Sequence, residues 1–182
     1  GYLTIKGYED GLYILGFPNE EVRKALYRMV VPALTLKNNS QIVTIQALLL
    51  KNMREGKVAE AMKHLRALIA DVPYSNKKMA SMDMEERYRL IISSILNAIG
   101  FSVEVEKMLA TGRIDIVAKT PRFIYVIELK LSNNGGKRAG VRQILEHQYL
   151  APFKSDKRET IGLALELDDL GKGLTDWEEV KD

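Results

Sequence analysis

Apolar residues recur along this chain with two different periods, and the change between them divides the sequence near residue 80. The chain opens with an alternating stretch, residues 2–15, which is typical of a β-hairpin with its turn around Gly7 to Gly11. Three segments then carry apolar side chains at the three- and four-residue intervals of amphipathic helices: 20–31, 40–53 and 58–69. The sequence therefore predicts a hairpin followed by a helical region over residues 1–80.

Capping residues and prolines predict where individual helices begin and end. Asn19 can cap the first helix, which we expect to end at Val31, before Pro32. Asp83 can cap a later helix that Gly100 would close, since glycine readily takes the left-handed conformation just past a helix end.

From residue 81 onward, short strand-like segments alternate with helical ones. The expected elements are a helix at 83–99, strands at 101–107, 112–119 and 123–131, a flexible connection at 133–136, a helix at 139–150 and a strand at 160–167. This α-β-β-β-α-β order predicts an α/β fold with a mixed sheet flanked by helices. Residues 1–80 would then be an N-terminal helical annex to a domain formed by residues 81–182.

Composition narrows the class of protein. With 182 residues, 46% of them hydrophobic and 28% charged, the chain has the ordinary mix of a globular fold. The absence of cysteine excludes disulfides, thiolate zinc sites and a cysteine nucleophile, and it fits a reducing cytoplasm. No stretch of 18 apolar residues predicts a membrane span, and the start does not resemble a signal peptide. Because the first residue is Gly1, we expect a piece of a longer chain.

Basic residues are concentrated in the second half of the sequence. Residues 119–158 include nine Lys and Arg residues but only three Asp and Glu residues. A basic band on a near-neutral body suits a polyanion such as nucleic acid, and Lys137, Arg138 and Arg142 are its candidate contacts. An ordinary solvated Lys/Arg surface is an equally good interpretation of this density.

The chemistry-bearing residues lie on two neighbouring strands. Segment 123–131 is apolar on both faces, as expected for a central strand, until Glu128 and Lys130 appear near its end. A buried carboxylate is costly unless a cation or a metal ion compensates it. Asp115 interrupts the preceding strand, and the short connection between the two strands predicts an antiparallel pair.

The pairing register decides whether these side chains meet. If Asp115 lay opposite Val126, Glu128 would be its diagonal neighbour, about 7–8 Å away on the same face. Two carboxylates at that spacing suit Mg²⁺ or Mn²⁺, and Lys130 on the same side could approach a phosphate or an attacking water. The alternative is a structural ion pair of Glu128 with Lys130 or Arg113.

A third acid comes from the helix at 83–99. Glu85 shares the apolar face of this helix, whereas Glu86 shares a side with Arg89 and other polar residues, which we interpret as solvated. Glu85 is therefore expected to point toward the sheet. A first-turn glutamate favoured by the helix dipole is the simpler alternative.

Taken in order, these residues resemble the PD-(D/E)XK nuclease superfamily. The resemblance rests on Glu85, the Gly-Arg-Ile-Asp strand ending at Asp115, Ile127 to Lys130, and Gln143-Ile144. More narrowly, the chain is similar to the C-terminal nuclease-like domain of bacterial AAA-ATPase-like proteins of unknown function, common in Bacteroidetes. Tyr125 to Lys130 corresponds to their Y-x-x-E-x-K strand, and segment 139–153 to their helix. Residues 1–6 and 15–19 resemble the tail of their ATPase-like region.

The resemblance implies a restriction-endonuclease-like core and a Mg²⁺- or Mn²⁺-dependent phosphodiesterase that cuts nucleic acid, with DNA favoured over RNA. Asp115 and Glu128 would bind the ion, and Glu85 would complete or orient its shell. Lys130 would position water or offset charge, and Gln143 would contact water or substrate. It also implies an upstream ATPase-like partner domain, for which residues 1–80 form the tail, and allows a homodimer.

One residue departs from the family pattern. His147 stands where the family has a lysine four residues after the glutamine, which puts a phosphate contact there in doubt. Two other interpretations stay open at this point. The chain could be a module of the same fold that binds nucleic acid without cutting it, or a structural or regulatory appendage whose residues 1–75 pack on an upstream ATPase.

Overall fold

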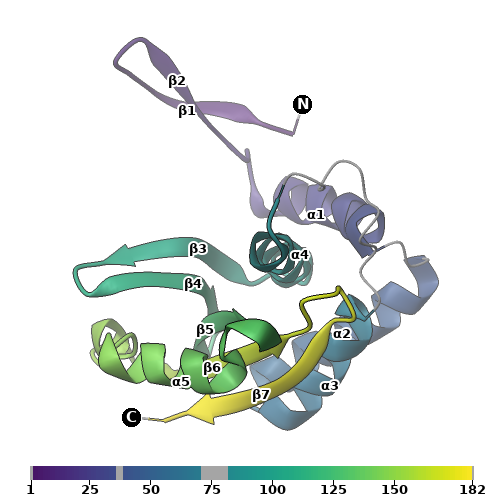
Figure 1. The fold of residues 1–182 in the computed structure, drawn as a ribbon. Coiled ribbons are helices and arrows are strands. Elements are labelled where there is room, and N and C mark those ends of the chain that lie inside the picture. Colours follow the sequence, from purple (N-terminus) through teal and green to yellow (C-terminus); the bar gives the residue numbers. More distant parts are fainter. Residues whose placement is uncertain (1, 36–38, 71–81, 182) are drawn as a thin grey trace.

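The structure, a computed structural model, describes residues 2–35, 39–70 and 82–181 (Figure 1). An N-terminal hairpin and three helices precede a second, mixed part of helices and strands. The elements of the first part are β1 (Thr4–Glu9), β2 (Leu12–Gly16), α1 (Glu20–Thr35), α2 (Asn39–Arg54) and α3 (Val58–Ile69). Those of the second part are α4 (Met84–Ala98), β3 (Ser102–Leu109), β4 (Gly112–Lys119), β5 (Phe123–Leu131), α5 (Gly136–Glu146), β6 (Glu159–Leu167) and β7 (Leu174–Val180), with short 3-10 turns at Ser132–Asn134 and Ala151–Phe153.

The predicted α/β class is confirmed by a five-stranded mixed sheet of order β3-β4-β5-β6-β7. Strands β5 and β6 run parallel, and each other neighbouring pair runs antiparallel. The sequence analysis missed β7, whose three acidic residues weaken its alternation. At the edge of the sheet this strand buries Leu174 and Val180 while its charges face solvent.

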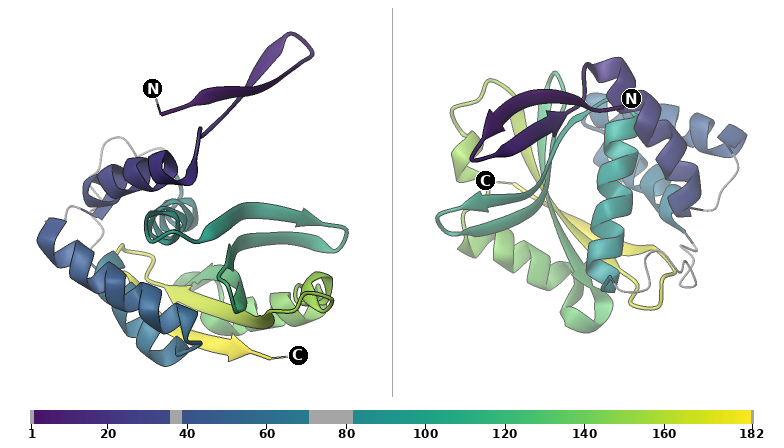
Figure 2. Two further views of the ribbon diagram at one scale, coloured as in Figure 1. Left: turned by 180° about the vertical axis from the view of Figure 1, so that it is seen from behind. Right: turned by 90° about the horizontal axis from the view of Figure 1, so that it is seen from above.

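Helices cover both faces of the sheet (Figures 1 and 2). The larger apolar cluster joins α2, α3 and α4 to one face, and a smaller cluster joins α5 to the other face. The helical annex therefore shares its apolar core with the sheet. The division of the chain near residue 80 stays a prediction. No helix in the described part of the chain combines the length and the apolar character that a membrane crossing requires.

The predicted ends of α4 are confirmed. The Asp83 carboxylate accepts a hydrogen bond from the backbone N–H of Glu86 at 2.8 Å, which satisfies one of the first free N–H groups of the helix. After the helix, Gly100 takes a φ of +95°, and the Phe101 N–H donates back to the Leu96 carbonyl at 3.1 Å. These two ends aim α4 directly at the start of β3.

The predicted end of α1 before Pro32 is wrong, although its Asn19 cap is confirmed. The helix runs through Pro32 to Thr35, whose hydroxyl donates to the Val31 carbonyl at 2.9 Å. Val31 and Thr35 are both buried, so tertiary packing outweighs the one backbone hydrogen bond that proline removes.

The boundaries of α5 differ from the prediction of 139–150. Residues 133–136, expected as a flexible connection, form the end of a 3-10 turn and the first residue of the helix. The helix ends at Glu146, because Gln148 takes a left-handed φ of +51° and the Tyr149 N–H returns to the Ile144 carbonyl at 3.0 Å. This earlier end turns the Tyr149 side chain inward.

The N-terminal hairpin β1–β2 extends away from the rest of the molecule (Figures 1 and 2). Its turn is confined to Asp10 and Gly11, and Gly7 lies within β1 rather than in the turn. Most of its apolar side chains are exposed, among them Tyr8, Leu12 and Tyr13. Assignment of this hairpin to an upstream ATPase-like domain stays a prediction.

Candidate active site

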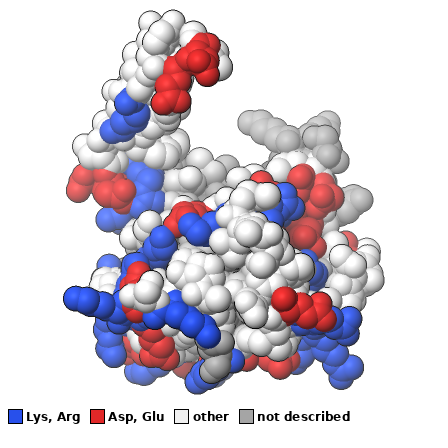
Figure 3. Space-filling view, turned by 90° about the vertical axis from the view of Figure 1, so that its left-hand side faces the viewer, with Lys and Arg blue, Asp and Glu red and all other residues white. Residues whose placement is uncertain are grey.

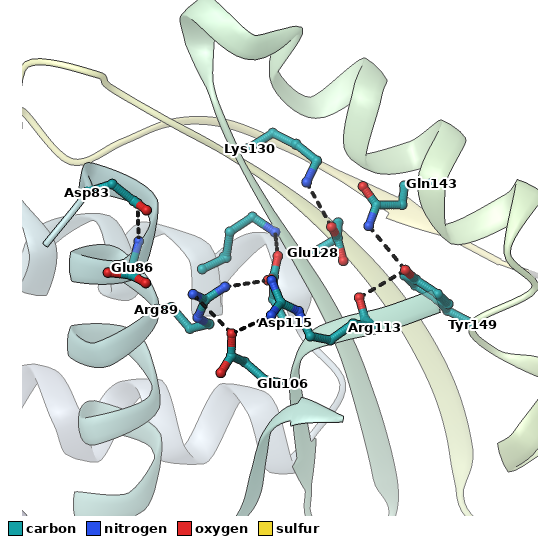
Figure 4. Close-up of polar contacts among 11 residues, drawn as sticks. Asp83, Glu86, Arg89, Glu106, Arg113, Asp115, Glu128, Lys130, Gln143 and Tyr149 are labelled. Carbon is teal, nitrogen blue, oxygen red and sulfur yellow. Dashed lines mark hydrogen bonds and ion pairs between the residues drawn. The ribbon is translucent and has the colours of Figure 1, made fainter. Parts of the chain in front are cut away.

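Strand β4 leaves β5 at the residue that carries the first candidate acid. The β4–β5 pairing ends with Ile116 opposite Ile127, while β4 stays paired with β3 as far as Gly112. Val117, not Asp115, lies opposite Val126, so the register that we considered is wrong by two residues. Continuing the observed register, Asp115 faces Glu128 directly across the point where the two strands separate (Figure 4).

Asp115 is buried, and both of its carboxylate oxygens accept hydrogen bonds. The Arg89 guanidinium donates to Oδ1 at 2.9 Å, and the backbone N–H of Leu129 donates to Oδ2 at 2.9 Å. Because Leu129 follows Glu128 in β5, the second bond ties the separating strands together. Asp115 therefore closes the sheet locally as well as contributing charge.

Glu128 is 1% exposed and has one unsatisfied oxygen. Its Oε1 accepts from the Lys130 amine at 2.9 Å, while the buried Oε2 has no hydrogen-bond partner among the described residues. Burial, together with the neighbouring Asp115 charge, raises the pKa of Glu128 to about 8. The raised pKa and the free Oε2 indicate that the cations around this pair compensate the Glu128 charge incompletely.

Lys130 lies beside Glu128 on the face covered by α5. Desolvation lowers the pKa of Lys130, but the hydrogen bond and the charge of Glu128 outweigh it, so the pKa is raised overall. The amine thus keeps its proton at neutral pH and is a cation, not a base. The pairing with Glu128 that we considered as a structural alternative is present, whereas Arg113 instead binds Glu106 at 2.9 Å.

Glu85 is half-buried near the start of α4, and its surroundings agree with the predicted inward orientation. Burial raises the pKa of Glu85, and the charges of Lys130 and Asp115 act on it as well. Glu85 therefore lies close enough to Lys130 and Asp115 for their charges to affect its ionisation. The side chain has no direct hydrogen bond to either of them among the contacts described.

Gln143, on α5, belongs to a chain of hydrogen bonds that reaches β4 (Figure 4). Its Nε2 donates to the Tyr149 hydroxyl at 3.1 Å, and this hydroxyl donates to the Arg113 carbonyl at 2.9 Å. Gly140, one turn earlier on α5, packs near the Lys130 side chain, where an added Cβ would lie 3.7 Å from Lys130 Cγ. Tyr149 therefore fixes the orientation of the Gln143 amide on α5.

Removing the Tyr149 hydroxyl is expected to loosen this connection. Tyr149→Phe leaves the Arg113 carbonyl and the Gln143 amide without a partner, so we expect a loss of about 1–2 kcal/mol in the free energy of unfolding. Denaturant unfolding followed by circular dichroism measures the change. Tyr13→Phe, on the exposed hairpin, is the matched control. Equal stability of both variants and the wild type would contradict this role.

The sequence analysis missed Arg89. Its helix stripe, interpreted as solvated, is in fact buried, with Arg89, Ser93 and Asn97 each less than 10% exposed, because α1 packs against it. Arg89 donates to Asp115 and lies 3.3 Å from Glu106. A signal was present, since Arg89 follows Glu85 by four residues, which makes the two side chains neighbours on the same side of α4.

The donor set fits a divalent ion in part. Glu128 Oε2, beside Asp115, has no hydrogen-bond partner among the described residues and is the kind of oxygen ligand that Mg²⁺ or Mn²⁺ binds. Within the described ranges, however, no three acidic or histidine side chains converge as a metal-binding cluster. Glu85 thus does not complete a three-ligand cluster with the pair, and Arg89 already binds Asp115 Oδ1.

Several members of the predicted basic band are neutralised by carboxylates. Lys119 pairs with Glu104, Lys137 with Asp176 and Arg158 with Asp156. Arg138 and Arg142 are exposed on α5 and make no ion pair among the described residues. On the side of the molecule that bears the tip of the β3–β4 hairpin, basic and acidic groups are interspersed (Figure 3).

One comparison with known proteins matches part of this chain. A family model described as PD-(D/E)XK nuclease superfamily matches residues 83–172, which run from the Asp83 cap of α4 into the β6–β7 connection. No significant match was found among curated proteins or among solved structures. The five-stranded mixed sheet and its flanking helices are consistent with the restriction-endonuclease-like fold of that superfamily, whose family model matches residues 83–172.

Proposed function

We propose that this chain is a metal-dependent nuclease that hydrolyses phosphodiester bonds of nucleic acid, as the C-terminal domain of a larger ATPase-like protein. The observation that carries the proposal is the buried Glu128 Oε2, which lies beside a second buried carboxylate, Asp115, and has no hydrogen-bond partner in the part of the chain that the structure describes. A purely structural ion pair would not leave that oxygen unsatisfied, because an unpaired buried acceptor is costly. The nuclease-like family match supports the same reaction class.

The proposed roles follow from the contacts. Asp115 and Glu128 would hold a Mg²⁺ or Mn²⁺ ion, with Glu85 orienting its surroundings. When bound, such an ion polarises a phosphate and activates a coordinated water. Lys130, kept protonated by Glu128, would offset the negative charge that develops on the phosphate. Gln143, fixed by Tyr149, would direct its amide oxygen toward the attacking water.

The direct test is a cleavage assay on plasmid DNA and on mixed DNA and RNA oligonucleotides. We expect cleavage with Mg²⁺ or Mn²⁺, none with EDTA, and none from Asp115→Ala. Glu178→Ala, an exposed acidic residue on β7, is the matched control and should cleave normally. A folded protein that cuts neither nucleic acid with any divalent ion would contradict the proposal. The comparison of DNA with RNA tests the expected preference for DNA.

A second candidate is a module of the same fold that binds nucleic acid without cutting it. The observation that favours it is the Arg89 guanidinium, which already neutralises Asp115. Salt-sensitive binding without cleavage, unaffected by Asp115→Ala, would support this second function over the first. An upstream ATPase-like partner, a homodimer and a cytoplasmic location stay predictions under either function.

Both functions predict a difference among the three basic residues of α5. The double variant Arg138→Gln/Arg142→Gln should weaken nucleic-acid binding and reduce the slope of log affinity against log salt by about 2. Lys137→Gln should change binding less, because Lys137 is paired with Asp176. Fluorescence anisotropy of a labelled oligonucleotide over a salt series measures both. Equal effects of the double variant and Lys137→Gln would contradict this assignment.

A further inference from the structure

Arg89 holds one of the two Asp115 oxygens that could bind a divalent ion. Its Nη1 donates to Asp115 Oδ1 at 2.9 Å, and the Leu129 N–H donates to Oδ2 at 2.9 Å, so each oxygen keeps one lone pair. Arg89 and Asp115 are both nearly excluded from water, so their contact is a desolvated pair of opposite charges. A divalent ion on this carboxylate would lie close to the guanidinium, and the two cations would repel each other and compete for the same negative charge.

A second carboxylate already contacts the same guanidinium. Arg89 Nη2 lies 3.3 Å from Oε1 of Glu106, a partly exposed residue on β3 whose Oε1 also binds Arg113 Nη1 at 2.9 Å. Arg89 thus bridges a buried acid and an accessible one (Figure 4). If it released Asp115, it would still retain an ionic partner, so the move would not leave an uncompensated buried cation.

There is also room for the movement. A cleft of about 610 Å³ lies between α1, α4 and β3, and both Arg89 and Glu106 line it. Arg89 therefore borders open space as well as the Asp115 carboxylate. A side chain locked in close packing on every side would have no such second position.

We propose that Arg89 is a positioning residue that acts as a latch on Asp115. Without a divalent ion, it holds and neutralises the Asp115 carboxylate. When an ion binds between Asp115 and Glu128, the guanidinium transfers to Glu106 and the cleft. The proposal rests on the proposed function, since it requires that an ion binds Asp115. Under this proposal, the affinity for the divalent ion depends on how well the ion competes with the Arg89 guanidinium for the Asp115 carboxylate.

The test is a double-mutant cycle of Arg89→Met and Glu106→Gln, read out as Mn²⁺ binding by electron paramagnetic resonance. Arg89→Met should bind Mn²⁺ about tenfold more tightly than the wild type. Glu106→Gln should bind it about tenfold more weakly, because the released guanidinium loses its alternative partner. The double variant should match Arg89→Met. Circular dichroism verifies folding, and Arg89→Gln replaces Arg89→Met if the latter does not fold.

Each of the following outcomes would contradict a specific part of the proposal for Arg89. Weaker Mn²⁺ binding by Arg89→Met means that Arg89 merely orients Asp115, and the latch is wrong. An equal effect of Glu106→Gln in both backgrounds indicates a plain charge effect and removes the transfer step. Unchanged affinity in Glu106→Gln alone also contradicts the transfer. If Asp115→Asn binds Mn²⁺ as well as the wild type does, the ion is not at Asp115, and the proposed function fails together with the latch.

Discussion

Replacing Glu128 by glutamine is expected to lower metal-dependent cleavage by about a thousandfold or more while leaving the protein folded. The substitution keeps the shape of the side chain and a carbonyl oxygen that can accept from the Lys130 amine. It removes the negative charge on the oxygen that has no partner, and with it the attraction for a divalent ion. Loss of a single group positioned for charge stabilisation typically costs about 10²–10³ in rate, and loss of the ion adds to this.

The assay needs a control that changes the same chemical group elsewhere. Glu178→Gln makes the same chemical change on the exposed side of β7 and should cleave at the wild-type rate. Initial rates of plasmid nicking at saturating Mg²⁺ provide the comparison. If Glu128→Gln retained a rate within tenfold of the wild type, Glu128 would not be a ligand of a catalytic ion.

The same residue should dominate the pH dependence of stability. In the folded state, burial and Asp115 raise the pKa of Glu128 to about 8 from its ordinary value near 4.5. Between these two values the folded state binds more protons at this site than the unfolded state does. Stability must therefore fall as pH rises from about 4.5 to 8, by roughly 3–5 kcal/mol from this group.

Glutamine at position 128 removes that dependence, so Glu128→Gln should be more stable than the wild type at pH 8 and similar at pH 4.5. A bound divalent ion should stabilise the folded protein, whereas the repulsion between the Glu128 and Asp115 carboxylates destabilises it. Mg²⁺ or Mn²⁺ should therefore raise the melting temperature of the wild type at pH 8 far more than at pH 5, and not that of Glu128→Gln. Thermal unfolding by circular dichroism over a pH series measures both effects. Parallel stability curves for the two proteins would show that Glu128 ionises normally.

The expected loss of cleavage and the expected gain in stability of Glu128→Gln have the same cause, the Glu128 Oε2 atom without a hydrogen-bond partner among the described residues. An acid that weakens the folded protein at neutral pH is unfavourable for folding alone, and functional sites are where such strain is found. The variant that loses activity should thus be the more stable one. A variant that lost both would indicate a structural role for the Glu128–Lys130 pair.

Much of the second half of the fold could be predicted from local patterns. The bounds of β4 and β5 follow from apolar runs between turn residues, and α4 follows from its Asp83 cap and Gly100. The same patterns failed where packing outweighs local preference. Helix α1 continues through Pro32 because Val31 and Thr35 are buried, and β7 pairs at the sheet edge despite its acidic side chains.

The candidate site shows the same division between local and long-range information. The period of two in a strand places Glu128 and Lys130 on one side of β5, and it explains why an ionic contact between them could be foreseen. Arg89 could not be foreseen in the same way. The face of α4 that carries Arg89 is buried because α1 packs against it, and the residues of α1 lie more than 50 positions away in the sequence.

The amino-acid sequence by itself determined the order of the elements as far as β6, the presence of two acids and an amine on adjoining strands, and the helix that carries Glu85. These are local properties, decided by residue type and spacing. The tertiary structure alone decided the register that sets Asp115 against Glu128 and the point at which β4 separates from β5. It also decided that Arg89 binds Asp115 and that Glu128 Oε2 has no hydrogen-bond partner among the described residues. Those features depend on contacts between distant segments, and burial there sets the charge state that local sequence cannot specify.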